Sequence, residues 1–115
     1  GVNQATTVMQ LPYGDMQTST DAQFLMEALM REVIQLAQAL HVNLSENDIT
    51  AWYPILNSLS PDGKTSMLQD YEAGRKSEVE IFAGKVVELG RNQHMPTPIN
   101  EAVLHIIRVM ERNFT

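Results

Sequence analysis

The chain contains no cysteine, which excludes a disulfide scaffold, a thiolate metal site and a cysteine nucleophile. The absence of cysteine also favours a reducing compartment. No apolar run approaches the roughly 18 residues of a membrane span, and the N-terminus lacks the basic and then apolar pattern of a secretion signal. We therefore expect a cytoplasmic protein that neither crosses a membrane nor is exported.

Basic residues are also scarce. The chain has 8 of them against 14 acidic residues, and its net charge is −6. They are scattered along the sequence and form no stripe, whereas a nucleic-acid binder needs a basic face that displaces counterions. Nucleic acid is therefore not an expected partner.

Metal and nucleotide motifs are missing as well. The three histidines, His41, His94 and His105, are far apart and have no partner at ligand spacing. The glycines form neither G-x-G-x-x-G nor a Walker loop, so this chain alone offers no phosphate cradle. We expect no metal site.

What remains is a chain of 115 residues, 43% of them apolar, which is the size and composition of one globular domain. No repeat or linker divides it, so we treat residues 1–115 as a single domain. Because the first residue is glycine rather than methionine, we expect the sequence to be a fragment of a longer protein or a processed form.

Apolar residues recur at three- and four-residue steps, and period-two alternation is missing throughout, so we predict an all-α domain. Residues 1–19 are polar and small and carry a turn signal at Pro12–Asp15. Five helical segments are expected after them: 20–43, 45–59 with a kink or break at Pro54, 65–70 ended by Gly74, 77–92, and a last helix from Thr97.

Capping boxes are predicted from the spacings Thr20–Gln23 and Ser77–Glu80, and Ser45 with Asp48 marks another helix start. Thr97 is expected to cap the last helix, with Pro98 at its first position. Gly84, inside a predicted helix, suggests tight packing between helices. Two apolar stripes are predicted to face the core: Phe24, Leu25, Ala28, Leu29, Val33, Leu36 and Leu40 in the first long helix, and Ile99, Val103, Ile106 and Met110 in the last.

Residues 64–80 do not have the pattern of a generic helix, because hydroxyls, amides and charges of both signs surround two helix starts. Helix N-termini favour bound anions, so Ser66 could contact a carboxylate. A pair of solvated helix caps would have the same composition. The residue chemistry alone leaves both interpretations open.

The motifs in this segment resemble a known family. Residues 66–70 (SMLQD), 72–75 (EAGR), 77–80 (SEVE) and 95–101 (MPTPINE) together resemble the C-terminal domain of the ketopantoate reductases, or 2-dehydropantoate 2-reductases. The resemblance is strong over residues 65–101 and collinear from Asn3 to Leu59. It therefore covers nearly the whole chain.

The resemblance implies a helical domain of the 6-phosphogluconate dehydrogenase C-terminal type, which is the substrate-capping half of a two-domain reductase. An N-terminal Rossmann domain, absent from this chain, would bind NADP, whose hydride reduces the ketone of ketopantoate on the route to pantothenate and coenzyme A. The general-acid lysine of the family would lie upstream of Gly1. The isolated chain is therefore expected to be inactive and to contain no catalytic residue.

Carried over position by position, the family's substrate-binding residues correspond to Ser66 and Asn3, and its cofactor-contacting glutamate to Glu78. The sequence departs from the family pattern at Gln4, where proline usually follows the asparagine, and at Tyr13, where a further asparagine is usual. These departures leave a different 2-oxo acid open as the substrate.

A helical interaction or dimerisation module without chemistry is a competing interpretation, supported by the acidic, fully helical character of the chain. A homodimer is compatible with either interpretation. The position of Ser66 and Glu78, in an open cleft or in a subunit contact, would distinguish them.

Overall fold

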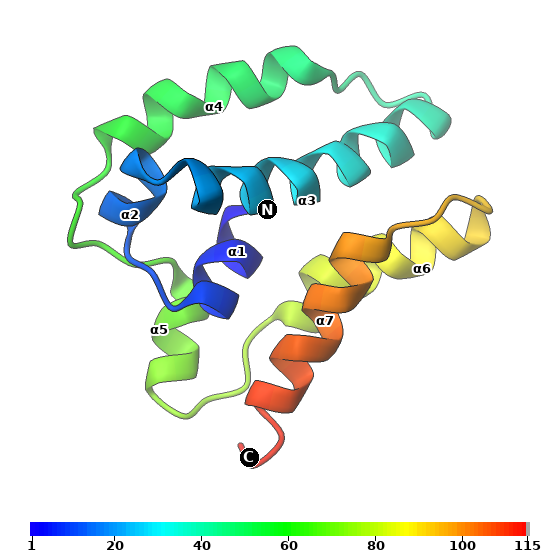
Figure 1. The fold of residues 1–115 in the computed structure, drawn as a ribbon. Coiled ribbons are helices and arrows are strands. Elements are labelled where there is room, and N and C mark those ends of the chain that lie inside the picture. Colours follow the sequence, from blue (N-terminus) through cyan, green and yellow to red (C-terminus); the bar gives the residue numbers. More distant parts are fainter. Residues whose placement is uncertain (115) are drawn as a thin grey trace.

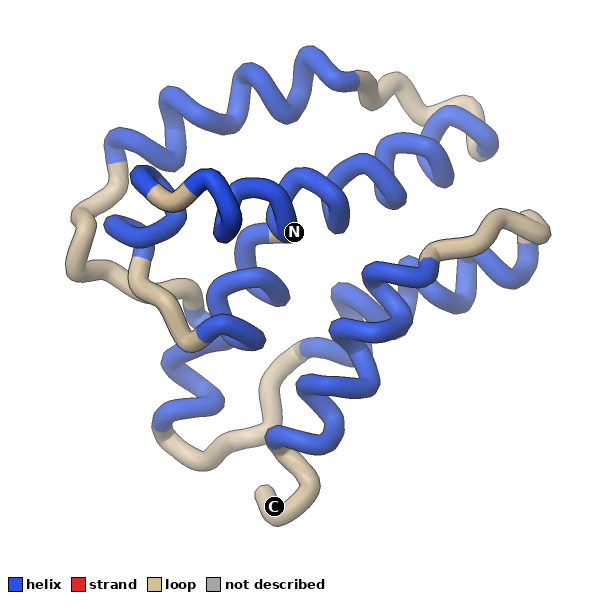
Figure 2. The backbone as a smooth tube through the Cα atoms, viewed as in Figure 1, coloured by secondary structure: helices blue, strands red, loops and turns tan. Residues whose placement is uncertain are grey.

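A computed structural model describes residues 1–114, and the regular structure within that range is entirely helical (Figure 2). The predicted all-α class is confirmed. The helices, in chain order, are α1 (Val2–Met9), α2 (Tyr13–Thr18), α3 (Thr20–Ala39), α4 (Glu46–Ser58), α5 (Ser66–Glu72), the π-helical η1 (Glu80–Gly84), α6 (Lys85–Asn92) and α7 (Pro98–Met110).

The short helix α1 lies at the centre of the fold, where it contacts α3, α5 and α7 (Figure 1). Ala5 and Thr6 are fully buried. The small side chains let neighbouring helices approach, and the threonine hydroxyls return hydrogen bonds to their own helix, as from Thr7 Oγ1 to Asn3 O at 2.7 Å. A segment that is polar by composition is therefore part of the core.

The turn predicted at Pro12–Asp15 is instead the start of α2, with Pro12 as the preceding residue. The first two backbone amides of α2 bond to the loop before α5. Tyr13 N donates to Gly63 O, and Gly14 N donates to Pro61 O, each at 2.9 Å. Proline is common both in turns and at helix starts. Here the contacts with the loop at Pro61 and Gly63 favour the start of α2.

The N-cap of α3 is Ser19 rather than the predicted Thr20. Ser19 Oγ accepts a hydrogen bond from Ala22 N at 3.2 Å. Gln23, expected to complete a capping box, instead donates its side-chain amide to Met16 O at 2.9 Å. The start of the helix was predicted to within one residue, but its capping partners were wrong.

Three residues assigned to core-facing stripes, Phe24, Leu40 and Ile106, lie outside the core. Phe24 is 75% exposed, because Met26 and its neighbours on α3 occupy the inward positions. Ile106 is 45% exposed, and Leu104 and Ile107 are buried in its place on α7. In both helices the periodicity was correct and the assigned phase was partly wrong.

The helix start predicted at Ser45 and Asp48 is confirmed, and these two residues form a capping box at the start of α4. Pro54 was predicted to kink or break the helix. It does not break it, because α4 continues through Pro54 to Ser58. Pro54 and Thr50, whose carbonyl loses its helical donor, are both exposed, so water can bind the free carbonyl. Helix α4 lies alongside α3 on the outside of the domain (Figure 1).

Gly74 ends α5 as predicted, with φ of 73°. The predicted Ser77–Glu80 capping box is wrong, because both residues bond to the C-terminal helical region. Ser77 N donates to Glu111 Oε1 at 2.7 Å, and Glu80 forms an ion pair with Arg108. The segment joining α5 to α6 is therefore fixed by contacts with distant residues.

The close helix packing predicted at Gly84 is also wrong. A Cβ atom there would meet only the Glu80 side chain, at an ordinary 3.4 Å. The glycine that does require its small size is Gly90, where a Cβ would lie 2.7 Å from Met95 O and 2.9 Å from Thr97 Cγ2. The loop that follows α6 packs directly against Gly90, through Met95 and Thr97.

Helix α7 starts at Pro98 as predicted, but the Thr97 side chain forms no capping hydrogen bond. The buried carboxylate of Glu32, on α3, takes that role. Its Oε2 accepts from Ile99 N and its Oε1 from Asn100 N, each at 2.8 Å. Within residues 1–114, no helix is long and apolar enough to cross a membrane.

Candidate functional site

Ser66 and Glu78 lie on the same small hollow, although twelve positions separate them in the chain. The hollow encloses about 110 Å³ between the start of α5 and the entry to η1. Both side chains are exposed. The structure therefore brings together two of the three predicted site residues. The lining consists of Ser66, Met67, Asp70, Glu78 and Phe82.

Ser66 is the first residue of α5, and its position depends on the buried residue before it. Thr65 is 2% exposed, and its Oγ1 caps the helix by accepting from Leu68 N at 3.2 Å. The same Oγ1 lies 2.8 Å from Thr6 Oγ1 on α1. An exposed serine is therefore held at the end of a well-anchored helix.

Glu78 is similarly fixed through its neighbours. Its carbonyl accepts hydrogen bonds from Ile81 N at 3.0 Å and Phe82 N at 3.1 Å, which begin the η1 turn. Val79, the next residue, is 1% exposed and anchors the segment in the core. The backbone of Glu78 is thus fixed while its carboxylate points to solvent. Turns of π-helix occur frequently at functional sites.

Sequence reasoning did not identify three residues of the hollow, Met67, Asp70 and Phe82. Asp70 lies four positions after Ser66 and therefore on the same face of α5. It also forms an ion pair with Arg75 at 3.2 Å. The helix spacing could have identified Asp70. No simple signal identified Phe82, because its placement depends on the π turn.

Asn3 does not line this hollow. It is half-buried on α1, and its carbonyl accepts from Thr6 Oγ1 at 3.1 Å. Because Thr6 also contacts Thr65, Asn3 is linked to the start of α5 through one intervening side chain. Tyr13, the position that departs from the family pattern, does not line the hollow either and packs against Gly63.

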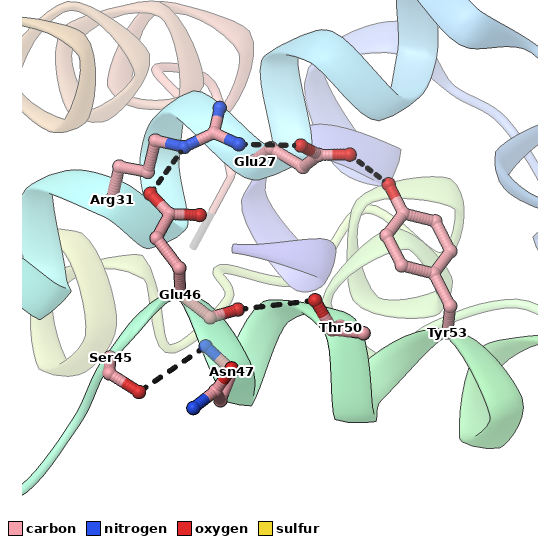
Figure 3. Close-up of polar contacts among 7 residues, drawn as sticks. All are labelled: Glu27, Arg31, Ser45, Glu46, Asn47, Thr50 and Tyr53. Atoms are coloured by element: carbon pink, nitrogen blue, oxygen red, sulfur yellow. Dashed lines mark hydrogen bonds and ion pairs between the residues drawn. The ribbon is translucent and has the colours of Figure 1, made fainter.

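A second polar cluster joins α3 to α4 (Figure 3). Arg31 lies between two carboxylates and donates to Glu27 Oε1 and Glu46 Oε1, each at 2.9 Å. The Tyr53 hydroxyl donates to the other oxygen of Glu27. Burial, followed by this contact with a carboxylate, raises the pKa of Tyr53 to about 12. One guanidinium thus serves two carboxylates, and these contacts hold α4 against α3.

A wider hollow, about 380 Å³, lies between η1, α6 and α7. Its arginines are already paired: Arg108 with Glu80 at 2.5 Å, and Arg91 with Glu101 at 2.6 Å. The hydrogen bond from Arg108 lowers the pKa of the Glu80 carboxyl. In the part of the chain that the structure describes, no group of histidine and acidic side chains could hold a metal ion.

Solved structures show which class of protein has this fold. The dimeric ketopantoate reductase from Staphylococcus aureus superposes with a TM-score of 0.88 at 22% identity, over 98% of this chain and 39% of that one. D-mandelate dehydrogenase, in a ternary structure with NADH and anilino(oxo)acetate, gives a TM-score of 0.86 at 16% identity, over 96% of this chain and 47% of that one. The fold is that of the helical domain in such dehydrogenases.

The family itself follows from sequence. The family model described as "Ketopantoate reductase PanE/ApbA C terminal" matches residues 1–111, and the chain belongs to this family. The membership expected from the motifs of residues 65–101 is confirmed.

Relatives named 2-dehydropantoate 2-reductase include the protein of Pyrobaculum aerophilum, 30% identical over 112 residues, which are 96% of this chain and 39% of that protein. Another, from Halobacterium salinarum, is 25% identical over 98% of this chain and 37% of its own length. The chain therefore spans less than two fifths of either relative.

Proposed function

We propose that the chain is the substrate-capping domain of an NADP-dependent 2-dehydropantoate 2-reductase, which reduces ketopantoate to pantoate on the route to pantothenate and coenzyme A. Family membership and the names of the relatives support the reaction class. The observation that carries the proposal for this chain is the single hollow shared by Ser66 and Glu78.

In this proposal the Ser66 hydroxyl donates a hydrogen bond to the 2-oxo acid, and Asn3 supports the same substrate from α1. The exposed carboxylate of Glu78 accepts a hydrogen bond from the carboxamide at the nicotinamide end of the cofactor. Glu78 and the aromatic residue Phe82 line the same hollow, and this combination suits that end of the molecule. Bound NADPH supplies the hydride.

The remaining chemistry is assigned to the part of the protein outside residues 1–115. An N-terminal Rossmann domain would bind the phosphates of the cofactor, for which this chain has no glycine-rich loop. A lysine upstream of Gly1 would protonate the developing alkoxide as general acid. The hollow on α5 and η1 then forms one wall of the substrate site, and the Rossmann domain forms the other.

We further propose that the whole protein is cytoplasmic and associates as a homodimer. The dimeric reductase of S. aureus, which shares the fold of this domain, supports the second point.

The proposal is tested with the native full-length protein by following NADPH oxidation with ketopantoate and with a series of other 2-oxo acids. We expect turnover with ketopantoate, and none from residues 1–115 alone. Preference for another acid would keep the chemistry and change the substrate. Failure to oxidise NADPH with any 2-oxo acid would contradict the proposal and favour the interaction module.

A further inference from the structure

A buried contact between two hydroxyls joins α1 to α5. Thr6 Oγ1 and Thr65 Oγ1 lie 2.8 Å apart, from positions 59 residues apart in the chain. Thr6 is 0% and Thr65 2% exposed, so water does not compete for the contact. Helix α1 carries Asn3, and α5 begins with Ser66 directly after Thr65. The two helices contact each other (Figure 1).

The available hydrogen atoms fix the direction of this contact. Thr6 Oγ1 lies 2.8 Å from Val2 O and 3.1 Å from Asn3 O, and carbonyl oxygens can only accept. The single hydroxyl hydrogen of Thr6 is therefore used within α1. Consequently Thr65 must donate to Thr6, while Thr65 Oγ1 itself accepts from Leu68 N at 3.2 Å.

The result is a one-way chain of hydrogen bonds, from the Leu68 amide through Thr65 and Thr6 to the carbonyls of Val2 and Asn3. Each hydroxyl donates once and accepts once, and within the described residues no buried side-chain polar atom is left without a partner. Valine would fill nearly the same volume but could neither donate nor accept.

We infer that Thr6 and Thr65 are positioning residues that set the placement of Ser66 relative to Asn3 across the α1–α5 contact. The inference rests on the proposed function, since it gives these two helices a common substrate. The chain of bonds ends on the carbonyls of Val2 and Asn3, and the Asn3 carbonyl also accepts from Thr7 Oγ1 at 2.7 Å. Its other end is the N-cap of the helix that presents Ser66.

Loss of the Thr6 hydroxyl should affect the site only by changing the placement of α5 relative to α1. In Thr6→Val the cap formed by Thr65 is kept, but the Thr65 hydroxyl loses its buried acceptor and must find another. The α1–α5 contact then shifts, and Ser66 moves relative to Asn3. Binding of the 2-oxo acid weakens, while cofactor binding by the Rossmann domain is not affected.

The test is steady-state kinetics of the full-length protein carrying Thr6→Val, Thr6→Ser, Thr65→Val, Thr65→Ser or both valine changes, with the wild type assayed first. We expect Thr6→Val to raise KM for the 2-oxo acid about tenfold, equivalent to about 1.4 kcal/mol, with KM for NADPH unchanged. Both serine variants should restore KM to within about threefold of wild type. The double valine variant should be no worse than the worse single variant, because both changes break one chain of bonds.

Thr97→Val provides the matched control, because Thr97 is also a buried threonine but lies in the loop before α7. It should leave KM for the 2-oxo acid unchanged. If Thr6→Val lowers the melting temperature but not substrate affinity, the pair is merely structural and the inference is overturned while the proposed function stands. If the wild type reduces no 2-oxo acid, the proposed function fails, and the positioning role fails with it.

Discussion

The carboxylate of Glu32 on α3 and the amide groups of Asn100 on α7 form a buried pair between residues 68 positions apart. Glu32 Oε1 accepts from both Asn100 N and Asn100 Nδ2 at 2.8 Å, and Asn100 Nδ2 also lies 3.2 Å from Leu29 O. Asn100 is 1% and Glu32 8% exposed. One carboxylate therefore both caps α7 and joins it to the longest helix.

Glu32→Gln should destabilise the domain by about 1.5–3 kcal/mol, the range for a hydrogen bond to a charged group. In glutamine, an NH2 group replaces one of the two carboxylate oxygens. This group would face the N–H of Ile99 or Asn100, and two donors cannot bond to each other. We expect the melting temperature to fall by about 10 °C. Calorimetry or urea unfolding measures the effect.

Glu88→Gln is the matched control, since Glu88 is exposed and its carboxylate pairs with Lys85 at 3.7 Å. It should change the free energy of unfolding by less than about 0.5 kcal/mol. Equal stability of the two variants would show that Glu32 does not hold α7 in place.

Two glycines on adjacent turns should respond in opposite ways to alanine. Gly90→Ala places a Cβ 2.7 Å from Met95 O, so the loop must move, at a cost of about 1–3 kcal/mol. Gly84 has helical dihedral angles, φ −61° and ψ −41°, and room for a Cβ, so Gly84→Ala should be neutral or stabilise by up to about 1 kcal/mol. Urea unfolding of both variants tests this, and a Gly84→Ala loss as large as that of Gly90→Ala would contradict it.

The raised pKa of Tyr53 predicts a loss of stability in alkali. The tyrosine keeps its proton in the folded state up to a pKa of about 12, whereas the unfolded chain releases it near 10. Between these values the folded state binds more protons, so the free energy of unfolding falls as pH rises. Tyr53→Phe should abolish this part of the pH dependence when unfolding is measured from pH 9 to 12. An unchanged slope would show that the pKa of Tyr53 is not raised.

Glu78→Gln in the full-length protein should lower kcat about 10- to 100-fold, the effect of one hydrogen bond to a charged group. The fold should be intact, because the backbone of Glu78, and not its carboxylate, starts the η1 turn. Asp21→Asn is the control: Asp21 is likewise an exposed carboxylate at a helix start, but on α3. A kcat equal to wild type in Glu78→Gln would reject the assigned role.

Local signals in the sequence predicted most of the helices. The capping pair Ser45 and Asp48 lies within four residues, and α4 begins where this spacing places it. The end of α5 also depends on a local signal, because Gly74 itself adopts the positive φ that ends the helix. Where a helix boundary depends on near neighbours, the amino-acid pattern contains the necessary information.

The predictions failed where the partner lies far along the chain. The cap of α7 comes from Glu32 rather than Thr97, and the amide of Ser77 bonds to Glu111 rather than to a nearby glutamate. No spacing rule connects such residues before the helices have packed. For the same reason α1 was missed, since its threonines are buried by α3, α5 and α7, which come from distant parts of the chain.

The candidate site was predicted in part. Motifs identified Ser66 and Glu78, and the structure places both on one hollow. The contribution of Phe82 could not be predicted, because the π-helical η1 changes which residues after Glu78 face the hollow.

The central claim, that this hollow binds the substrate of a reductase, is tested most directly by kcat/KM for the 2-oxo acid in full-length Ser66→Ala. We predict a loss of about 1–3 kcal/mol of transition-state stabilisation, or roughly 5- to 150-fold in kcat/KM. Ser60→Ala, at an exposed serine in the loop between α4 and α5, should leave kcat/KM at the wild-type value. If kcat/KM of Ser66→Ala equals that of Ser60→Ala and the wild type, the hollow does not bind the substrate through Ser66 and the account is wrong.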